Sequence, residues 1–145
     1  MKPIFFLFLF VTLFVNCKKG KTDQEKIQDY VDANHLVGSF TPSGLFVVVD
    51  QPGSGGNPTI NNIVKVEYAG QLLDGTRFDA TATGVPIEFP LQQVILGWQE
   101  GIPKFQKGGY GKLIIPSALG YGSSAVGKIP ANSVLLFNVS LIDWR

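Results

Sequence analysis

Apolar and polar residues alternate regularly near the end of the chain. Over residues 132–145, apolar side chains recur at every second position from Leu135 to Leu141, and Asn138 and Ser140 lie between them. A period of two places the apolar side chains on one face of an extended strand. This segment predicts a β-strand with that face buried, and it is the strongest such pattern in the chain.

Shorter runs have the composition of strands, because they are rich in β-branched and aromatic residues and are bounded by turn formers. One of them places Val64, Val66 and Tyr68 on one face, opposite Lys65 and Glu67. Together with the last segment, the predicted strands cover residues 44–50, 63–70, 76–80, 85–91, 108–118 and 132–145.

Two segments have the spacing of helices. Residues 23–37 place Ile27, Val31 and their apolar neighbours at helical intervals, which predicts a short amphipathic helix that packs on the domain and has Asp23 as its cap. Residues 91–105 are the helical candidate within the strand region, and a proline near the end bounds it. One short helix laid across a curved antiparallel sheet would cover its apolar face, which is an α+β arrangement.

The beginning of the chain differs from the rest. Lys2 precedes an apolar run over residues 4–15, interrupted only by Thr12, and the only cysteine, Cys17, follows it. The run is shorter than the roughly 20 residues that a membrane-spanning helix needs, and it has the length of a secretory signal core. These residues predict export.

Cys17 has two interpretations, because a lone cysteine cannot form an intramolecular disulfide. It could be a free or buried thiol, or it could be acylated, since the segment resembles a bacterial lipoprotein signal in which the cysteine becomes the lipid-bearing N-terminus. The second interpretation predicts a signal peptide at 1–16, an anchor, linker and helix at 17–37, and a folded domain at 38–145. The protein would then be an exported lipoprotein anchored to a membrane, on the periplasmic side or at the outer membrane.

Composition excludes several classes of protein. The chain has 145 residues, is 45% hydrophobic and carries a net charge of +1, which suits one globular domain and gives no basic surface for nucleic acid. No cluster of His, Cys and carboxylates has the spacing of a metal site, and no nucleophile motif or phosphate-binding loop is present. The only histidine, His35, is expected to be solvated or to cap a helix. We therefore expect no cofactor.

The segment "LLDGTRFDAT" contains a turn and, shortly after it, a large aromatic residue followed by a carboxylate. Asp74 and Gly75 read as a tight turn between strands, and Phe78 is followed directly by Asp79. Asp79 could close a second turn, or it could lie in the wall of an apolar pocket. The residues alone leave both alternatives open.

Three stretches carry a resemblance to a known family: "VKVEYAGQLLDGTRFDAT", "FPLQQVILGWQEGI" and "KLIIPSALGYGSSAVGKIPANSVLLFNVSLIDW". In this order they are similar to the successive signatures of FK506-binding-type (FKBP) peptidyl-prolyl isomerases. The resemblance implies a roughly five- to six-stranded antiparallel half-barrel wrapped around one short helix, with a pocket between them. Carried over by position, it implies catalytic roles for Tyr68, Phe78, Asp79, Tyr121 and Phe137, and substrate-binding roles for Val94, Ile95, Trp98 and Ile129.

The chemistry implied by the family needs no covalent intermediate. Rotation about an X-Pro bond faces a barrier of about 18–20 kcal/mol because amide resonance is lost, and an apolar site favours the less polar twisted state. The family pattern makes Trp98 the pocket floor and makes the Ile95 N–H and the Tyr121 hydroxyl donors to substrate carbonyls. Asp79 would accept a hydrogen bond from Tyr68.

Three functions compete. The first is an isomerase that acts on proline-containing polypeptides, assists the folding of exported proteins, binds macrolides such as FK506 and is a monomer. The second is a binding module that kept the pocket and lost turnover. The third is a purely structural lipoprotein, which would leave the aromatic residues without a purpose.

Overall fold

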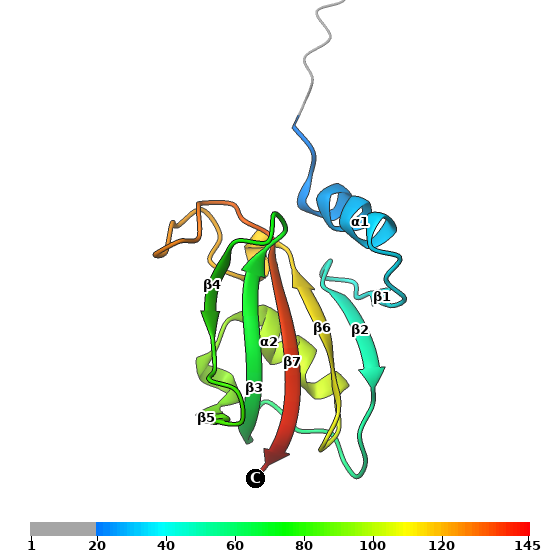
Figure 1. Cartoon of the computed structure of the whole chain (residues 1–145), viewed down its shortest axis with the longest axis vertical. Helices are drawn as coiled ribbons and strands as arrows, with labels where there is room; N and C mark the ends of the chain where they lie inside the picture. Colours follow the sequence, from blue (N-terminus) through cyan, green and yellow to red (C-terminus); the bar gives the residue numbers. More distant parts are fainter. Residues whose placement is uncertain (1–19) are drawn as a thin grey trace, which may run out of the picture.

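Antiparallel strands form one curved sheet in the computed structural model of the chain, which describes residues 20–145 (Figure 1). The strands are β1 (Ser39–Phe40), β2 (Phe46–Gln51), β3 (Ile63–Leu72), β4 (Arg77–Ala80), β5 (Ile87–Pro90), β6 (Tyr110–Ile115) and β7 (Leu135–Trp144). Their order is β1-β2-β6-β7-β3-β4, and β5 also pairs with β3. Every strand predicted from the sequence is present, and the two-residue β1 brings the sheet to seven strands. The α+β fold class is confirmed.

Strand β3 pairs with three other strands. One of its edges pairs with β7 along almost its whole length, and the other pairs with β5 over its first half and β4 over its second. The register shifts at Lys65/Val66 against β7 and at Gly70/Gln71 against β4. Bulges of this kind bend a strand and increase its twist, so the sheet can curl around the helix that covers it.

The helical segment predicted at 91–105 is divided into three short elements. These are the 3₁₀ turn η1 (Leu91–Gln93), the α-helix α2 (Leu96–Gly101) and the 3₁₀ turn η2 (Ile102–Lys104). Gly97 lets α2 approach β6 closely, because a Cβ atom at this position would lie 2.4 Å from the Cγ2 atom of Ile115. The close contact fixes α2 across the inner face of the sheet.

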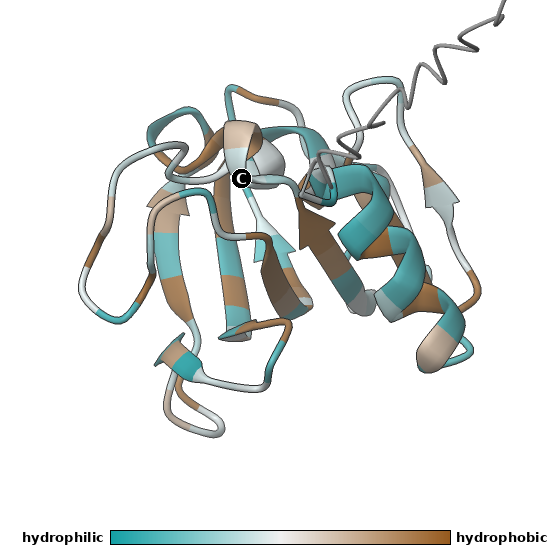
Figure 2. Cartoon of the chain, turned by 90° about the horizontal axis from the view of Figure 1, so that it is seen from above, coloured by the Kyte–Doolittle hydropathy of each residue, from teal (hydrophilic) through white to brown (hydrophobic). Residues whose placement is uncertain are grey.

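Strand residues alternate between hydrophobic and hydrophilic along the sheet (Figure 2). The inward-facing side chains of β3, β6 and β7 pack with Trp98 and Ile102 in an inner core, which also contains the fully buried Phe105. The predicted inward face from Leu135 to Leu141 is buried there.

The outer face of the sheet is also partly covered. Helix α1 (Asp23–Ala33) buries Ile27 and Val31 in a second cluster with Phe46, Ile114 and Leu136 of the strands. The predicted amphipathic helix therefore packs on the domain, and residue 38 does not mark a boundary of the hydrophobic core. The predicted signal peptide at 1–16 and Cys17 lie outside the described residues.

The cap of α1 differs from the prediction. Thr22, and not Asp23, is the N-cap: its hydroxyl accepts the Glu25 N–H at 3.3 Å, and the Glu25 carboxylate accepts the Thr22 N–H at 2.7 Å. This reciprocal pair is a capping box, which the sequence shows as Thr followed three residues later by Glu. Asp23 is left as the first helical residue, with its carboxylate available for another contact. His35, which follows the helix, is exposed.

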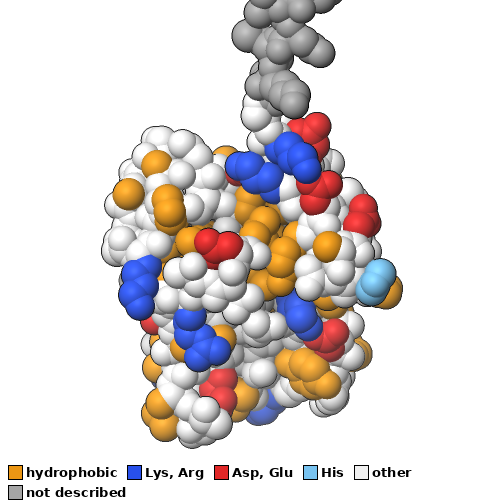
Figure 3. Space-filling model, turned by 45° about the horizontal axis from the view of Figure 1, so that its top comes forward, with side chains coloured by type: hydrophobic (Ala, Val, Ile, Leu, Met, Phe, Trp, Pro, Cys, Tyr) orange, Lys and Arg blue, Asp and Glu red, His pale blue; other side chains and the backbone are white. Residues whose placement is uncertain are grey.

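The surface carries mixed charge. On the face shown in Figure 3, basic and acidic side chains are interspersed over the described part of the chain. Within residues 20–145, no helix has both the length and the apolar character needed to span a membrane.

Ile27 tests whether α1 belongs to the folded unit. Its side chain is completely buried between α1 and the sheet, so Ile27→Ala should lower the free energy of unfolding by about 2–5 kcal/mol. Urea unfolding followed by circular dichroism measures this change. Val37 is 87% exposed, and Val37→Ala should change stability by no more than about 0.5 kcal/mol. Equal effects of the two substitutions would show that α1 is not packed on the sheet.

Candidate active site

A cavity of about 540 Å³ opens between α2, the strands β3 to β5 and the loop that follows η3 (Ser117–Leu119). Every residue that the sequence analysis placed in the pocket lines it: Tyr68, Phe78, Asp79, Val94, Ile95, Trp98, Tyr121, Ile129 and Phe137. The cavity is also lined by residues that the sequence analysis did not assign to it: Ile87, Phe89, Gln93, Val126, Gly127 and Lys128. Phe89 reaches the cavity because β5 pairs with β3, where Phe89 lies opposite Val64.

Trp98 of α2 lies at the bottom of the cavity, surrounded by aromatic rings. It is 4% exposed, and its ring meets those of Tyr68 and Phe137 edge to face, with centroid separations of 5.0 and 5.2 Å. Phe89 lies 5.4 Å away in a tilted arrangement, and Phe78 packs edge to face on Phe137 at 5.5 Å. Such geometries are the favoured ones for aromatic pairs, so these rings form a fixed apolar floor and wall.

The Trp98 indole has an unusual environment. Its Nε1 atom is buried and has no hydrogen-bond partner within the described chain. A buried donor without a partner is destabilising by about 1–3 kcal/mol. Few buried polar groups in native proteins lack a hydrogen-bond partner.

Gly70 of β3 permits the aromatic rings to converge. A Cβ atom at this position would lie 2.6 Å from the Phe78 ring and 2.7 Å from the Phe137 ring. Any other residue would push one of these rings out of place. The sequence pattern gave no reason to select Gly70, because the need for it arises from two side chains distant in the chain.

The pairing of β3 with β4 explains why two consecutive residues both line the cavity. Gly70 pairs with Asp79 and Gln71 pairs with Arg77, so Phe78 is an extra residue on β4. Neighbouring residues of a regular strand point to opposite faces, but a bulge changes this alternation. The bulge therefore allows the Phe78 ring and the Asp79 carboxylate to share one wall, and Asp79 is a pocket residue by position.

Asp79 is bonded within the site. The Tyr68 hydroxyl donates a hydrogen bond to Asp79 Oδ2 at 2.6 Å. Burial raises the pKa of Tyr68 above its ordinary value of 10.0, and the hydrogen bond to the Asp79 carboxylate raises it further, with a smaller contribution from the nearby Tyr121. Tyr68 is therefore a neutral donor that holds the carboxylate in a fixed orientation at the cavity edge.

Two further donors belong to residues that line the cavity, Tyr121 and Ile95. Tyr121 is 39% exposed and its side chain donates to no acceptor within residues 20–145. The Ile95 backbone N–H, immediately before α2, also has no acceptor among the described residues. Ile129 overhangs the cavity from a tight loop in which it and Val126 exchange backbone hydrogen bonds of 2.9 and 2.8 Å.

Within residues 20–145, no group of three or more His, Cys, Asp or Glu side chains is placed to hold a metal ion.

Comparison with known proteins identifies the family. The family model of the FKBP-type peptidyl-prolyl cis-trans isomerases matches residues 55–142, which include all of β3 to β6 and most of β7. The chain belongs to this family. The FKBP signatures read from the sequence and the FKBP-type arrangement of the sheet and helix therefore agree.

Several FKBP relatives are similar over most of this chain. The isomerase FkpA of Aeromonas hydrophila is 43% identical over 128 residues, which cover 86% of this chain and 48% of that protein. FkpA of Escherichia coli strain K12 is 41% identical over 131 residues, which cover 90% of this chain and 47% of that protein. The chain thus spans about half the length of these curated relatives.

Solved FKBP structures have the same fold. The crystal structure of FkpA from Escherichia coli has a TM-score of 0.76 and 38% identity, and the match covers 85% of this chain and 59% of that one. AtFKBP13 has a TM-score of 0.68 and 34% identity, and the match covers 74% of this chain and 98% of that one.

The hydrogen bond between Tyr68 and Asp79 predicts how Tyr68 titrates. The environment of the Tyr68 phenol favours its neutral form, which stabilises the folded state. This contribution to the free energy of unfolding is fully present below the ordinary pKa of tyrosine, and it is lost as the pH rises through the raised pKa of Tyr68 in the folded protein. In a spectrophotometric titration, the part of the tyrosinate signal that Tyr68→Phe removes should develop above pH 10.0. Asp79→Asn should move that part to lower pH, because the carboxylate charge opposes ionisation of the phenol. If Asp79→Asn left the Tyr68 part of the tyrosinate signal at the same pH, the hydrogen bond between Tyr68 and Asp79 would be contradicted.

Proposed function

We propose that this FKBP-type chain is an active peptidyl-prolyl cis-trans isomerase. The observation that supports this most strongly is the cavity of about 540 Å³, in which apolar rings surround Trp98 and the Asp79 carboxylate is oriented by Tyr68. Tyr121 and Ile95 add two donors that have no acceptor within residues 20–145. The substrates would be proline-containing segments of polypeptides. Macrolides such as FK506 would compete for the same cavity.

The aromatic floor would act on the proline ring. Trp98 offers a flat apolar surface, and Phe78 and Phe137 bound it on one side. In the twisted state the imide nitrogen is no longer conjugated with the carbonyl, so the bond is less polar than in the planar ground state. An apolar cavity favours that state over the planar one, which prefers to be solvated.

The polar groups would hold the flanking backbone. The Tyr121 hydroxyl and the Ile95 N–H would donate to substrate carbonyls, while Val94 and Ile129 enclose the bound segment. Asp79, oriented by Tyr68, would bias the electric field at the edge of the cavity. These roles require no bond between protein and substrate and no cofactor.

The cellular location of the protein is proposed from residues outside the described part of the chain. We propose that residues 1–16 direct export, that Cys17 is acylated and that the domain is held at a membrane. The segment from Lys18 to Lys21 would then lie near the membrane surface or act as a soluble tether. The clients would be proteins that fold after export, and the domain would act as a monomer.

Isomerase activity is the first test. The chain from Lys18 onward, which keeps α1, should accelerate cis–trans exchange of an X-Pro peptide, and FK506 should abolish the acceleration. Phe78→Ala and Asp79→Ala should each lower kcat/KM by roughly tenfold, the equivalent of about 1.4 kcal/mol of transition-state stabilisation.

The matched control is Asp74→Ala, in the same hairpin. Asp74 accepts the Thr76 N–H at 2.9 Å and does not line the cavity, so its removal should leave kcat/KM unchanged. A folded chain that binds FK506 without accelerating exchange would be a binding module instead. Full activity in Asp79→Ala would refute the role of Asp79.

Cys17 tests the anchor. In a bacterial host that acylates lipoproteins, the full chain should incorporate labelled palmitate and fractionate with membranes. Cys17→Ala should lose both properties, because alanine has no thiol that can be acylated and the acyl chains that would hold the protein on the membrane are then missing. Label retained by Cys17→Ala would exclude acylation of Cys17.

A further inference from the structure

The segment from Ser117 to Val134, here called the pocket loop, carries Tyr121 and Ile129 to the cavity. It begins with η3 and ends where β7 starts. Both of its ends lie against helix α1, which does not line the cavity. This arrangement raises the question of whether α1 sets the position of the loop.

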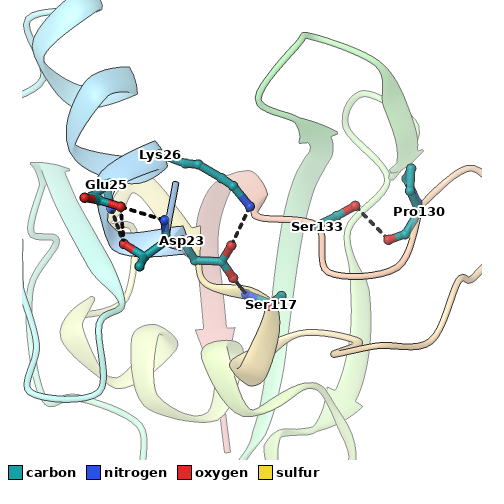
Figure 4. A network of polar contacts seen from close by, with 7 residues as sticks. Asp23, Glu25, Lys26, Ser117, Pro130 and Ser133 are labelled. Carbon is teal, nitrogen blue, oxygen red and sulfur yellow. Dashed lines mark hydrogen bonds and ion pairs between the residues drawn. The ribbon is translucent and has the colours of Figure 1, made fainter. Parts of the chain in front are cut away.

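The first contact is a hydrogen bond between α1 and the start of the loop. The Ser117 backbone N–H donates to Asp23 Oδ2 at 2.8 Å, and the Lys26 ammonium donates to Asp23 Oδ1 at 2.9 Å (Figure 4). One carboxylate oxygen is therefore held by the helix and the other by the pocket loop. The Asp23 side chain is only 20% exposed, and hydrogen bonds to an ionised acceptor are stronger than those between neutral groups.

The charge state of Asp23 favours this contact. Burial opposes ionisation of the carboxyl, but the hydrogen bonds from Ser117 and Lys26 outweigh it and lower the pKa of Asp23 below its ordinary value. Asp23 is thus a carboxylate at neutral pH.

Ser117 in turn holds the residues on either side of Tyr121. Its carbonyl accepts the Gly120 N–H at 3.0 Å and the Gly122 N–H at 2.8 Å. Asp23 accepts the N–H of Ser117, and both neighbours of Tyr121 donate to the C=O of Ser117, so this one residue connects α1 to both flanks of Tyr121. Tyr121 itself is 39% exposed and lines the cavity.

The end of the loop is held by packing. Val134 is 5% exposed and belongs to the outer cluster that contains Ile27. Next to it, the Ser133 hydroxyl donates to the Pro130 carbonyl at 2.7 Å (Figure 4). The Asn132 N–H donates to the Gly122 carbonyl at 2.8 Å and closes the base of the loop.

We propose that Asp23 is a positioning residue for the isomerase site, which acts through Ser117 to hold Tyr121 at the cavity without touching the substrate. This inference rests on the proposed function, because the Tyr121 hydroxyl matters only if it donates to a bound polypeptide. A chain of hydrogen bonds can carry coupling of this kind between residues that do not touch. The bonds from Asp23 to Ser117 and from Ser117 to Gly122 form such a chain.

The test compares Asp23→Ala with a control in the same helical turn. In the chain from Lys18 onward, Asp23→Ala should speed hydrogen exchange of the Gly120 and Gly122 amides and lower kcat/KM for an X-Pro peptide, each by about three- to tenfold. Asp23→Asn keeps an oxygen that can accept the Ser117 N–H. Its amide exchange rates and its kcat/KM should therefore lie between those of Asp23→Ala and those of the unmodified chain. Exchange rates are corrected for the global stability of each variant.

Glu25→Ala is the matched control. It removes a carboxylate and its hydrogen bonds to Thr22 from the same turn, but Glu25 does not contact the pocket loop. It should leave the corrected exchange rates and kcat/KM unchanged. If Asp23→Ala and Glu25→Ala have equal effects, or if Asp23→Ala leaves the exchange of Gly122 unchanged, the positioning role is overturned. A wild-type chain without activity would overturn the proposed function, whereas the exchange rates alone decide whether Asp23 holds the loop.

Discussion

The packing of Trp98 against Tyr68 and Phe137 is the contact on which the rest of the structure depends. It joins α2 to β3 and β7, the two longest strands of the sheet, and it forms the floor of the cavity. All three rings also line the open cavity. The same contact therefore stabilises the inner core and creates the surface on which a proline ring would rest.

Two features of the backbone make this arrangement possible. The bulge at Phe78 places an aromatic ring and a carboxylate on one wall, and the absence of a side chain at Gly70 gives that ring room beside Phe137. Both features lie in the hairpin of β3 and β4, which also carries Tyr68. A short piece of the chain thus provides much of the wall of the cavity and the hydrogen bond that orients Asp79.

The sequence predicted the strands well because their burial is periodic, as in the alternation from Leu135 to Leu141. It predicted the membership of the pocket because the family signatures occur in order along the chain. It could not predict the bulge at Phe78, which depends on the pairing register of β3 and β4, or the need for Gly70, which arises where the rings of Phe78 and Phe137 converge. The interpretation of Asp23 as a cap was wrong for a related reason: Thr22 and Glu25 satisfy the helix end locally, and Asp23 bonds to Ser117, which is distant in sequence.

The central claim is that a proline-containing segment lies on Trp98 while its imide bond rotates. The most direct measurement is an NMR titration with an X-Pro peptide, in which the indole N–H signals of the two tryptophans are separated by the variant Trp144→Phe. The account predicts that the Trp98 signal shifts and saturates together with the appearance of enzyme-catalysed exchange between the cis and trans peptide. Accelerated exchange while the Trp98 signal stays unmoved would contradict it.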